Sequence, residues 1–419
     1  MATNSEKPHI IDPHADFAAL ELSVYPDTAH DAHTEAVRDI YTEMLMAGAG
    51  TYDRAAFLDA WAHLGASGSV YASNDTIRVS VRARNEVLKK ALALMTLAFE
   101  KPRFEQKELV RIKKRLSEEL KLAKENAKAR AYQHFVNTLV PANDRRYEYD
   151  IDALRAALQK ITIADIRAFH KNVRNAPAGY AAGGTDTACR TILGTLTKLN
   201  LYRSTLHRDA AAIKMPTRRT VVLVDIPHKA NIEFSLGSGV PLLRTDPDFT
   251  PLFFGLRVLG IPGGFAGRLM SIVREKEGLT YGIYANLESF SEGEQGMWRI
   301  STFFAPKDAV QGITSTLREV ERIRTKGITE DELLRFKQIL ATRFSMVDDS
   351  LLKRVSERHG LEELGLTPEM FTAFKKDIAS LTTAEVNAVL KKYLDPSHIV
   401  ISGAGPIKSV EKELKKFAQ

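Results

Sequence analysis

EQKELVRIKKRLSEEL, residues 105–120, returns in altered form as TEDELLRFKQILATRF at residues 329–344. The apolar positions that correspond are Leu109, Ile112, Leu116 and Leu120 in the first copy and Leu333, Phe336, Leu340 and Phe344 in the second. Both series follow the three-to-four residue spacing of an apolar stripe on a buried helix. The sequence therefore predicts the same helix in each half of the chain.

A second pair of segments repeats in the same order. ITIADIRAF from Ile161 matches LTTAEVNAV from Leu381, and the threonine of each is placed to cap a helix three residues before an acidic residue. Both predicted helices lead into a short strand that ends in glycine, PAGYAAGG in one half and HIVISGAG in the other. A period of about half the chain indicates a duplicated domain rather than a solenoid.

Strand patterns point to an α+β fold. Apolar residues alternate at Ile77, Val79 and Val81 in the first half and at Ile232, Phe234 and Leu236 in the second, so one face of each sheet is buried. We predict two tandem homologous domains, each a mostly antiparallel sheet covered by helices on one face. The expected boundaries are residues 1–204 for the first domain, 205–218 for the linker and 219–419 for the second domain.

Composition narrows the function classes. The 419 residues are 44% hydrophobic, and the net charge of +7 is the small difference between 59 basic and 52 acidic side chains. The densest basic cluster, from Arg111, interleaves Glu with Lys and lacks aromatic residues, which favours a solvated helix face over a nucleic-acid groove. The single cysteine, Cys189, forbids an internal disulfide and is expected in the core.

No stretch of the sequence has the features of a signal peptide or a membrane anchor. We therefore expect a soluble protein that inserts into no membrane. The compartment is either the cytoplasm or, if a leader has been removed, the bacterial periplasm.

Residues 229–285 read KANIEFSLGSGVPLLRTDPDFTPLFFGLRVLGIPGGFAGRLMSIVREKEGLTYGIYA. An extended strand, a helix that starts at DPD, a glycine turn leading to GRL, and REKEGLTYGIY together resemble the second domain of the M16, or pitrilysin-like, peptidases. LGASGSVYASNDTIRVSV from Leu64 is similar to the strand pair of the family's first domain. The N-terminal thirty residues fit poorly, as expected if the first strand is shortened or replaced.

The active members of this family hold zinc with an inverted HxxEH motif on a helix and a distant Glu, the motif's Glu acting as general base. Here the corresponding helix reads AVRDIYTEMLMAGAGT, which places Asp39, Thr42 and Glu43 at the motif positions. Glu118 or Glu119 matches the distant ligand. One such carboxylate without imidazoles does not hold catalytic zinc, so we expect no metal in this chain and no activity of the chain alone.

Arg274 and Tyr281, in REKEGLTY, match an Arg and a Tyr with which the family reaches its zinc site from the second domain. The resemblance implies that Arg274 binds a substrate carbonyl or carboxylate and that Tyr281 both binds substrate and supports the oxyanion, a catalytic role. Aligning GASGSVYA from Gly65 with GLTYGIYA from Gly278 puts Gly68 opposite Tyr281 and Trp61 opposite Arg274. Only the second half carries both polar groups.

Two further motifs have plainer explanations. HDAHTE contains His30 and His33 close to Glu35, which would suit a metal, but the segment follows a strand and reads as a solvated loop. GIPGGFAG lacks both the dinucleotide spacing and the Walker lysine of phosphate loops, so a tight turn between helices explains it.

The resemblance implies a non-catalytic subunit of a heterodimeric metallopeptidase. This chain would form half of a clamshell, bind unfolded peptides, and meet a homologous partner that supplies HxxEH and Zn²⁺. One alternative is a structural subunit, like the inactive M16-like core proteins of respiratory complexes. Another is an independent metalloenzyme that uses His30 and His33.

Overall fold

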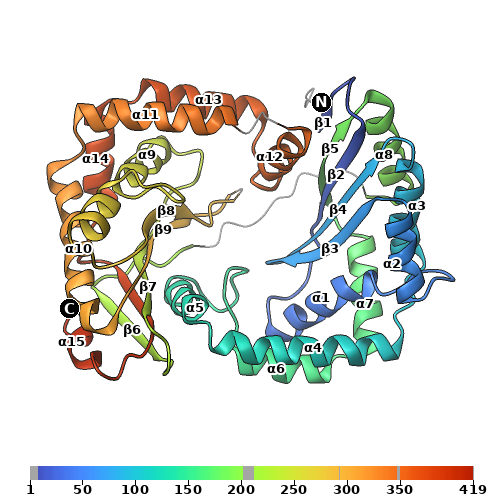
Figure 1. Ribbon diagram of the computed structural model, residues 1–419, viewed down its shortest axis with the longest axis horizontal. Helices are drawn as coiled ribbons and strands as arrows, with labels where there is room; N and C mark the ends of the chain where they lie inside the picture. Colours follow the sequence, from blue (N-terminus) through green and yellow to red (C-terminus); the bar gives the residue numbers. More distant parts are fainter. Residues whose placement is uncertain (1–7, 202–211, 292, 347–349, 419) are drawn as a thin grey trace. The chain divides into compact units, whose positions relative to one another are not determined.

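The computed structural model describes residues 8–201, 212–291, 293–346 and 350–418, which form two compact units (Figure 1). Each unit contains one five-stranded sheet. The first sheet comprises β1 His9–Ile11, β2 Phe17–Val24, β3 Ser67–Ser73, β4 Thr76–Arg84 and β5 Ala178–Gly184. The second comprises β6 Thr220–Asp225, β7 Ile232–Val240, β8 Ile283–Glu288, β9 Gly296–Phe304 and β10 Val400–Gly405.

The two sheets have the same topology, which confirms the duplicated α+β fold. Their strand orders are β1-β5-β2-β4-β3 and β6-β10-β7-β9-β8. In each sheet the first pair is parallel and the other three pairs are antiparallel. The alternating apolar residues of β4 and β7 are buried as predicted. β1 has three residues where β6 has six, in line with the shortened first strand.

Helices cover both sheets. The helices of the first unit are α1 Ala32–Leu45, α2 Arg54–His63, α3 Leu88–Glu100, α4 Gln106–Lys124, α6 Ile151–Lys160, α7 Ile163–Arg174, α8 Asp186–Lys198 and α12 Leu351–Glu363. Those of the second are α5 Ala127–Leu139, α9 Phe249–Leu259, α10 Ala309–Lys326, α11 Glu330–Ser345, α13 Pro368–Ser380, α14 Thr383–Tyr393 and α15 Glu411–Lys415. Among the described helices, none has both the length and the apolar character needed to cross a lipid bilayer.

The repeat extends to individual side chains. Thr162 and Thr382 each form a capping box, with Asp165 and Glu385 respectively, at the start of α7 and α14. Lys113 on α4 donates through Nζ to the carbonyl oxygens of Gln159 and Ile161, and Lys337 on α11 donates in the same way to Ala379 and Leu381. The same side chain therefore ties the equivalent helix to the equivalent turn in both units.

Each unit also takes one helix from the opposite half of the chain. α12 contacts β2 and β5 of the first sheet, and α5 contacts β7 and β10 of the second. Figure 1 shows this as a mismatch of colour, with teal α5 beside red β10 and orange-brown α12 beside green β5. Both exchanged helices lie on the sheet face opposite the main core, so that face is not bare as the sequence suggested.

Small residues make this close packing possible. On β5, Gly179, Ala181 and Gly183 face α12, and a Cβ added at Gly183 would lie 2.3 Å from the Val355 side chain. The compact units are consequently discontinuous in sequence. Of the expected linker, residues 205–211 lie outside the described part, and residues 212–219 form neither helix nor strand.

Candidate functional site

The segment that carries Arg274 has an unusual backbone. After α9 the chain makes a glycine turn, in which Gly263 and Gly267 have φ of +67° and +130°, and then forms the π-helix η1 Met270–Lys276. The Glu277 N–H donates to Ile272 O, five residues earlier, at 2.9 Å. π-helical turns are rare and are frequent at functional sites. As predicted, Arg274 lies near a helix end and Tyr281 just before the next strand, β8.

The structure brings Arg274 and Tyr281 together and adds a third side chain. The guanidinium carbon of Arg274 lies 5.1 Å from the ring centre of Tyr281 and 4.7 Å from that of Phe265. Tyr281 is 74% exposed and Phe265 64% exposed. Stacking on two aromatic rings orients a guanidinium while leaving its N–H edge open for ligands. Sequence reasoning missed Phe265, although a lone large apolar residue between glycines was a usable signal.

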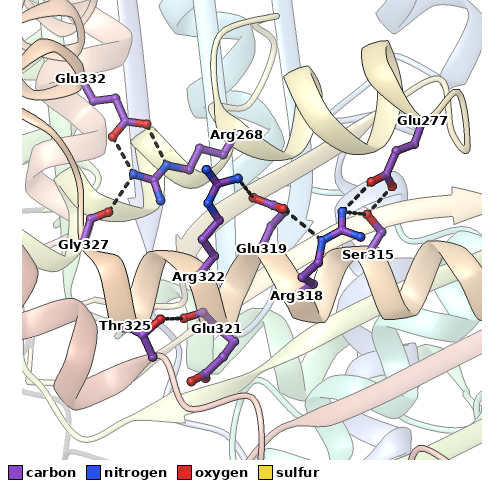
Figure 2. Close-up of polar contacts among 10 residues, drawn as sticks. All are labelled: Arg268, Glu277, Ser315, Arg318, Glu319, Glu321, Arg322, Thr325, Gly327 and Glu332. Atoms are coloured by element: carbon purple, nitrogen blue, oxygen red, sulfur yellow. Dashed lines mark hydrogen bonds and ion pairs between the residues drawn. The ribbon is translucent and has the colours of Figure 1, made fainter.

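Arg274 differs from the other arginines around it in its partners. Arg268 binds Glu332 with two hydrogen bonds of 2.7 and 2.6 Å, and Arg318 binds Glu277 (Figure 2). Among the described residues, no carboxylate pairs with Arg274. Its hydrogen-bonding capacity is therefore available to a ligand.

Ion pairs hold the segment at both ends. Before the π-helix, Arg268 binds Glu332 on α11 and also donates to the Gly327 carbonyl oxygen at 2.7 Å. After it, Glu277 accepts hydrogen bonds from Ser315 and Arg318 on α10 (Figure 2). Burial raises the pKa of Glu332, but hydrogen bonds from Arg268 and Thr329 outweigh burial and hold it below its usual value.

Arg268→Ala is expected to lower the free energy of unfolding by about 2 kcal/mol, because half-buried Glu332 loses two charge-assisted hydrogen bonds. A carboxyl whose folded-state pKa is depressed stabilises the fold above its unfolded pKa of about 4.3, and this contribution disappears as the pH falls through the folded value. The wild-type advantage in denaturant titrations should therefore shrink in acid. Hydrogen exchange should accelerate at residues 268–277 in the variant but not in Arg335→Ala, an exposed control on α11; equal exchange in both would contradict this anchoring.

The first unit has a different pair at the equivalent positions. A Cβ added at Gly68 would lie 2.6 Å from the Trp61 ring, so these two residues are neighbours, as Arg274 and Tyr281 are. Trp61 is buried and packs edge-on against Phe57. The first unit therefore fills with an indole the place where the second unit presents a cation and a phenol.

The helix aligned with the zinc motif does not have the side chains for that metal. Asp39, Thr42 and Glu43 lie on α1, and Glu43 binds Arg115 on α4, which also binds Glu119. Burial raises the pKa of the Asp39 carboxyl to about 6, with Glu43 adding to the rise and Arg38 opposing it. Glu118 pairs with Lys121 instead. With no imidazole at the motif and an arginine between two carboxylates, this donor set does not fit catalytic Zn²⁺.

The remaining candidates have structural roles or lie at the surface. His33 lies in the first turn of α1, not in a loop, and is exposed like His30. Across the described ranges, no three His, Cys, Asp or Glu side chains converge in an arrangement that could hold a metal. Cys189 is buried, which raises the pKa of its thiol to about 11. The basic cluster on α4 is interleaved with ion pairs, including Arg111 with Glu108.

Comparisons with known proteins agree with this architecture. The family model described as peptidase M16 inactive domain matches residues 218–340, and that described as insulinase, peptidase family M16, matches residues 36–147. Together these ranges cover more than half of the chain. No curated protein matches the sequence.

Solved structures share the fold at low sequence identity. A peptidase M16 inactive domain from Pseudomonas fluorescens is 23% identical with a TM-score of 0.81, and the match covers 95% of each chain. The periplasmic protease PqqL from Escherichia coli is 15% identical with a TM-score of 0.73, over 95% of this chain and 44% of PqqL. A chain of complex III2 from Candida albicans is 15% identical with a TM-score of 0.73, over 98% of this chain and 97% of that one.

The duplicated sheets, the exposed Arg274 and Tyr281 in an inactive-type second half, and a first half whose motif helix lacks zinc ligands are thus explained together: the chain belongs to the M16 peptidase family and is an inactive homologue within it.

Proposed function

We propose that this chain is the non-catalytic subunit of a heterodimeric zinc metallopeptidase. Its partner is a homologous M16 subunit that bears HxxEH and holds Zn²⁺. The chain itself binds an unfolded peptide and assists hydrolysis at the partner's active site through Arg274 and Tyr281.

The observation that carries this proposal is the unpaired, aromatic-flanked Arg274. A guanidinium with exposed donors and no carboxylate partner among the described residues is poorly explained by stability alone, because ion pairing would stabilise it further. The neighbouring Arg268 and Arg318, which anchor the segment, do have such partners. Arg274 is the arginine of this segment that is left for an external acceptor.

The roles of the two side chains follow from their donors. The zinc of the partner supplies an activated water and polarises the scissile carbonyl. Arg274 donates a planar pair of N–H groups to a peptide carbonyl or carboxylate and so fixes the position of the backbone. The Tyr281 hydroxyl makes no hydrogen bond within the described residues, and it donates to the oxygen that becomes negatively charged during attack.

The experiment that tests the proposal is co-purification of the tagged chain from its native source, followed by identification of the associated polypeptide. We expect a homologous chain with HxxEH, one zinc per pair, and peptide hydrolysis by the pair but not by either chain alone. One structural neighbour is a periplasmic protease, so we propose the bacterial periplasm as the first compartment to search, with the cytoplasm as the alternative. A pair that hydrolyses peptide no faster than the isolated partner would refute the proposal.

A second candidate function is that of a structural or assembly subunit. It is favoured by the match to a chain of complex III2 over nearly the full length of both chains. Such a subunit has no use for an unpaired Arg274 at an exposed site. If co-purification yields a larger assembly without an HxxEH chain, this second function replaces the first.

A further inference from the structure

The first unit contains a pocket of about 400 Å³ beside the helix where the metal motif is lost. Four elements form it: the end of α1, the exposed side of α2, the strand β3 and the middle of α4. Its walls include Glu43, Arg54, Leu58, Ser69, Arg111 and Arg115. All four elements belong to the same compact unit, so the pocket is complete in this chain.

The walls of this pocket have more hydrogen-bond donors than acceptors. Three guanidiniums contribute, and their side chains are 40 to 44% exposed. Arg111 gives one hydrogen bond, from Nε to Glu108 at 2.7 Å, while Arg54 comes only within 3.9 Å of that same carboxylate oxygen. Since each guanidinium has five N–H donors, one shared carboxylate leaves most of those on Arg54 and Arg111 without an acceptor in the described part of the chain.

Arg115 explains why the pocket selects against cations. It binds both Glu43 on α1 and Glu119 on its own helix, so the carboxylates nearest the degenerate motif are neutralised by an internal positive charge. A metal ion would have to displace this guanidinium. A ligand that brings acceptors would instead meet the open donors of Arg54 and Arg111.

β3 adds a feature suited to peptides. It is the outermost strand of its sheet, and Gly68, Ser69 and Val70 line the pocket. One edge of this strand therefore has backbone N–H and C=O groups without a strand partner, to which an extended peptide can hydrogen-bond. The exposed Leu58 supplies an apolar contact next to the arginines.

We propose that this pocket is a carboxylate-binding site, which receives an acidic, extended peptide segment. Arg54 and Arg111 bind a carboxylate of the peptide, and the β3 edge aligns its backbone. The site is separate from Arg274 and Tyr281 and does not depend on the function proposed for them.

The test uses the full chain alone and a fluorescein-labelled, C-terminally amidated hexapeptide with three glutamates. Its matched control is the same peptide with glutamines. Fluorescence anisotropy should show about tenfold or greater preference for the acidic peptide, because charge-assisted hydrogen bonds replace neutral ones. Raising NaCl from about 50 to about 500 mM should reduce that preference. Arg54→Gln combined with Arg111→Gln should abolish it, whereas Arg190→Gln, on the exposed side of α8, should leave it unchanged.

A glutamine peptide with a free C-terminal carboxylate distinguishes the source of the ligand. If it binds as tightly as the acidic peptide, the carboxylate site is supported and a chain terminus supplies its ligand; weak binding assigns the ligand to acidic side chains. Equal affinity for all three peptides would overturn the proposal. So would a preference that survives the double substitution in a protein with an unchanged thermal unfolding curve.

Discussion

Tyr281→Phe is expected to lower peptide turnover by the complex with the zinc-bearing partner about a hundredfold. The substitution removes one hydroxyl and keeps the ring, so the stacking on Arg274 at 5.1 Å persists. A donor aimed at a developing oxyanion acts in the transition state and much less in the ground state. The loss should therefore appear in kcat, with KM little changed, in steady-state assays of the reconstituted pair.

The matched control is Tyr52→Phe, an exposed tyrosine of the first unit outside the site. Both variants should unfold like the wild type, since Tyr281 is 74% exposed and its hydroxyl has no hydrogen bond within the described residues. Turnover at the unmodified rate with Tyr281→Phe would remove the assigned catalytic role. It would leave the family membership untouched.

Phe135→Ala is expected to lower the free energy of unfolding by about 3 to 5 kcal/mol, the range for deleting a buried aromatic side chain. Phe135 lies on α5 and is fully buried in a cluster with Ile213, Met297 and Val400. Although residue 135 belongs to the first half of the sequence, its neighbours all belong to the second unit. Hydrogen exchange should therefore accelerate in β7 and β10.

Leu122→Ala is the control, because Leu122 is 72% exposed near the end of α4 and its loss should cost less than about 0.5 kcal/mol. The location of the effect matters as much as its size. Faster exchange in β2 and β4 of the first sheet, with β7 and β10 unaffected, would contradict the exchange of helices between the units.

Local sequence patterns were sufficient to predict the repeated elements. The capping boxes at Thr162 and Thr382 formed as expected, because a cap depends on residues three positions apart. The alternation at Ile77, Val79 and Val81 identified a buried strand face for the same reason. Arg274 and Tyr281 came together as neighbours because a short turn of fixed geometry separates them.

Contacts between distant segments were not predictable in the same way. The apolar stripe of α5 indicates that one side is buried, but either sheet can bury an apolar stripe, and the sequence alone does not identify which. The role of Arg115 depends on Glu43, which is far away in sequence on another helix. Phe265 was overlooked because an exposed aromatic residue in a turn has no periodicity to reveal it.

The exchanged helices also constrain the order in which the molecule can be made. Ser23 on β2 hydrogen-bonds Glu363 at the end of α12, 340 positions later, at 2.6 Å. A ribosome that has released only the first two hundred residues has therefore produced β2 and β5 without the helix that packs on them. Contacts so distant in sequence form late and slowly. The N-terminal sheet must wait for nearly the whole chain, and during that interval its glycine and alanine face is a natural site for a chaperone.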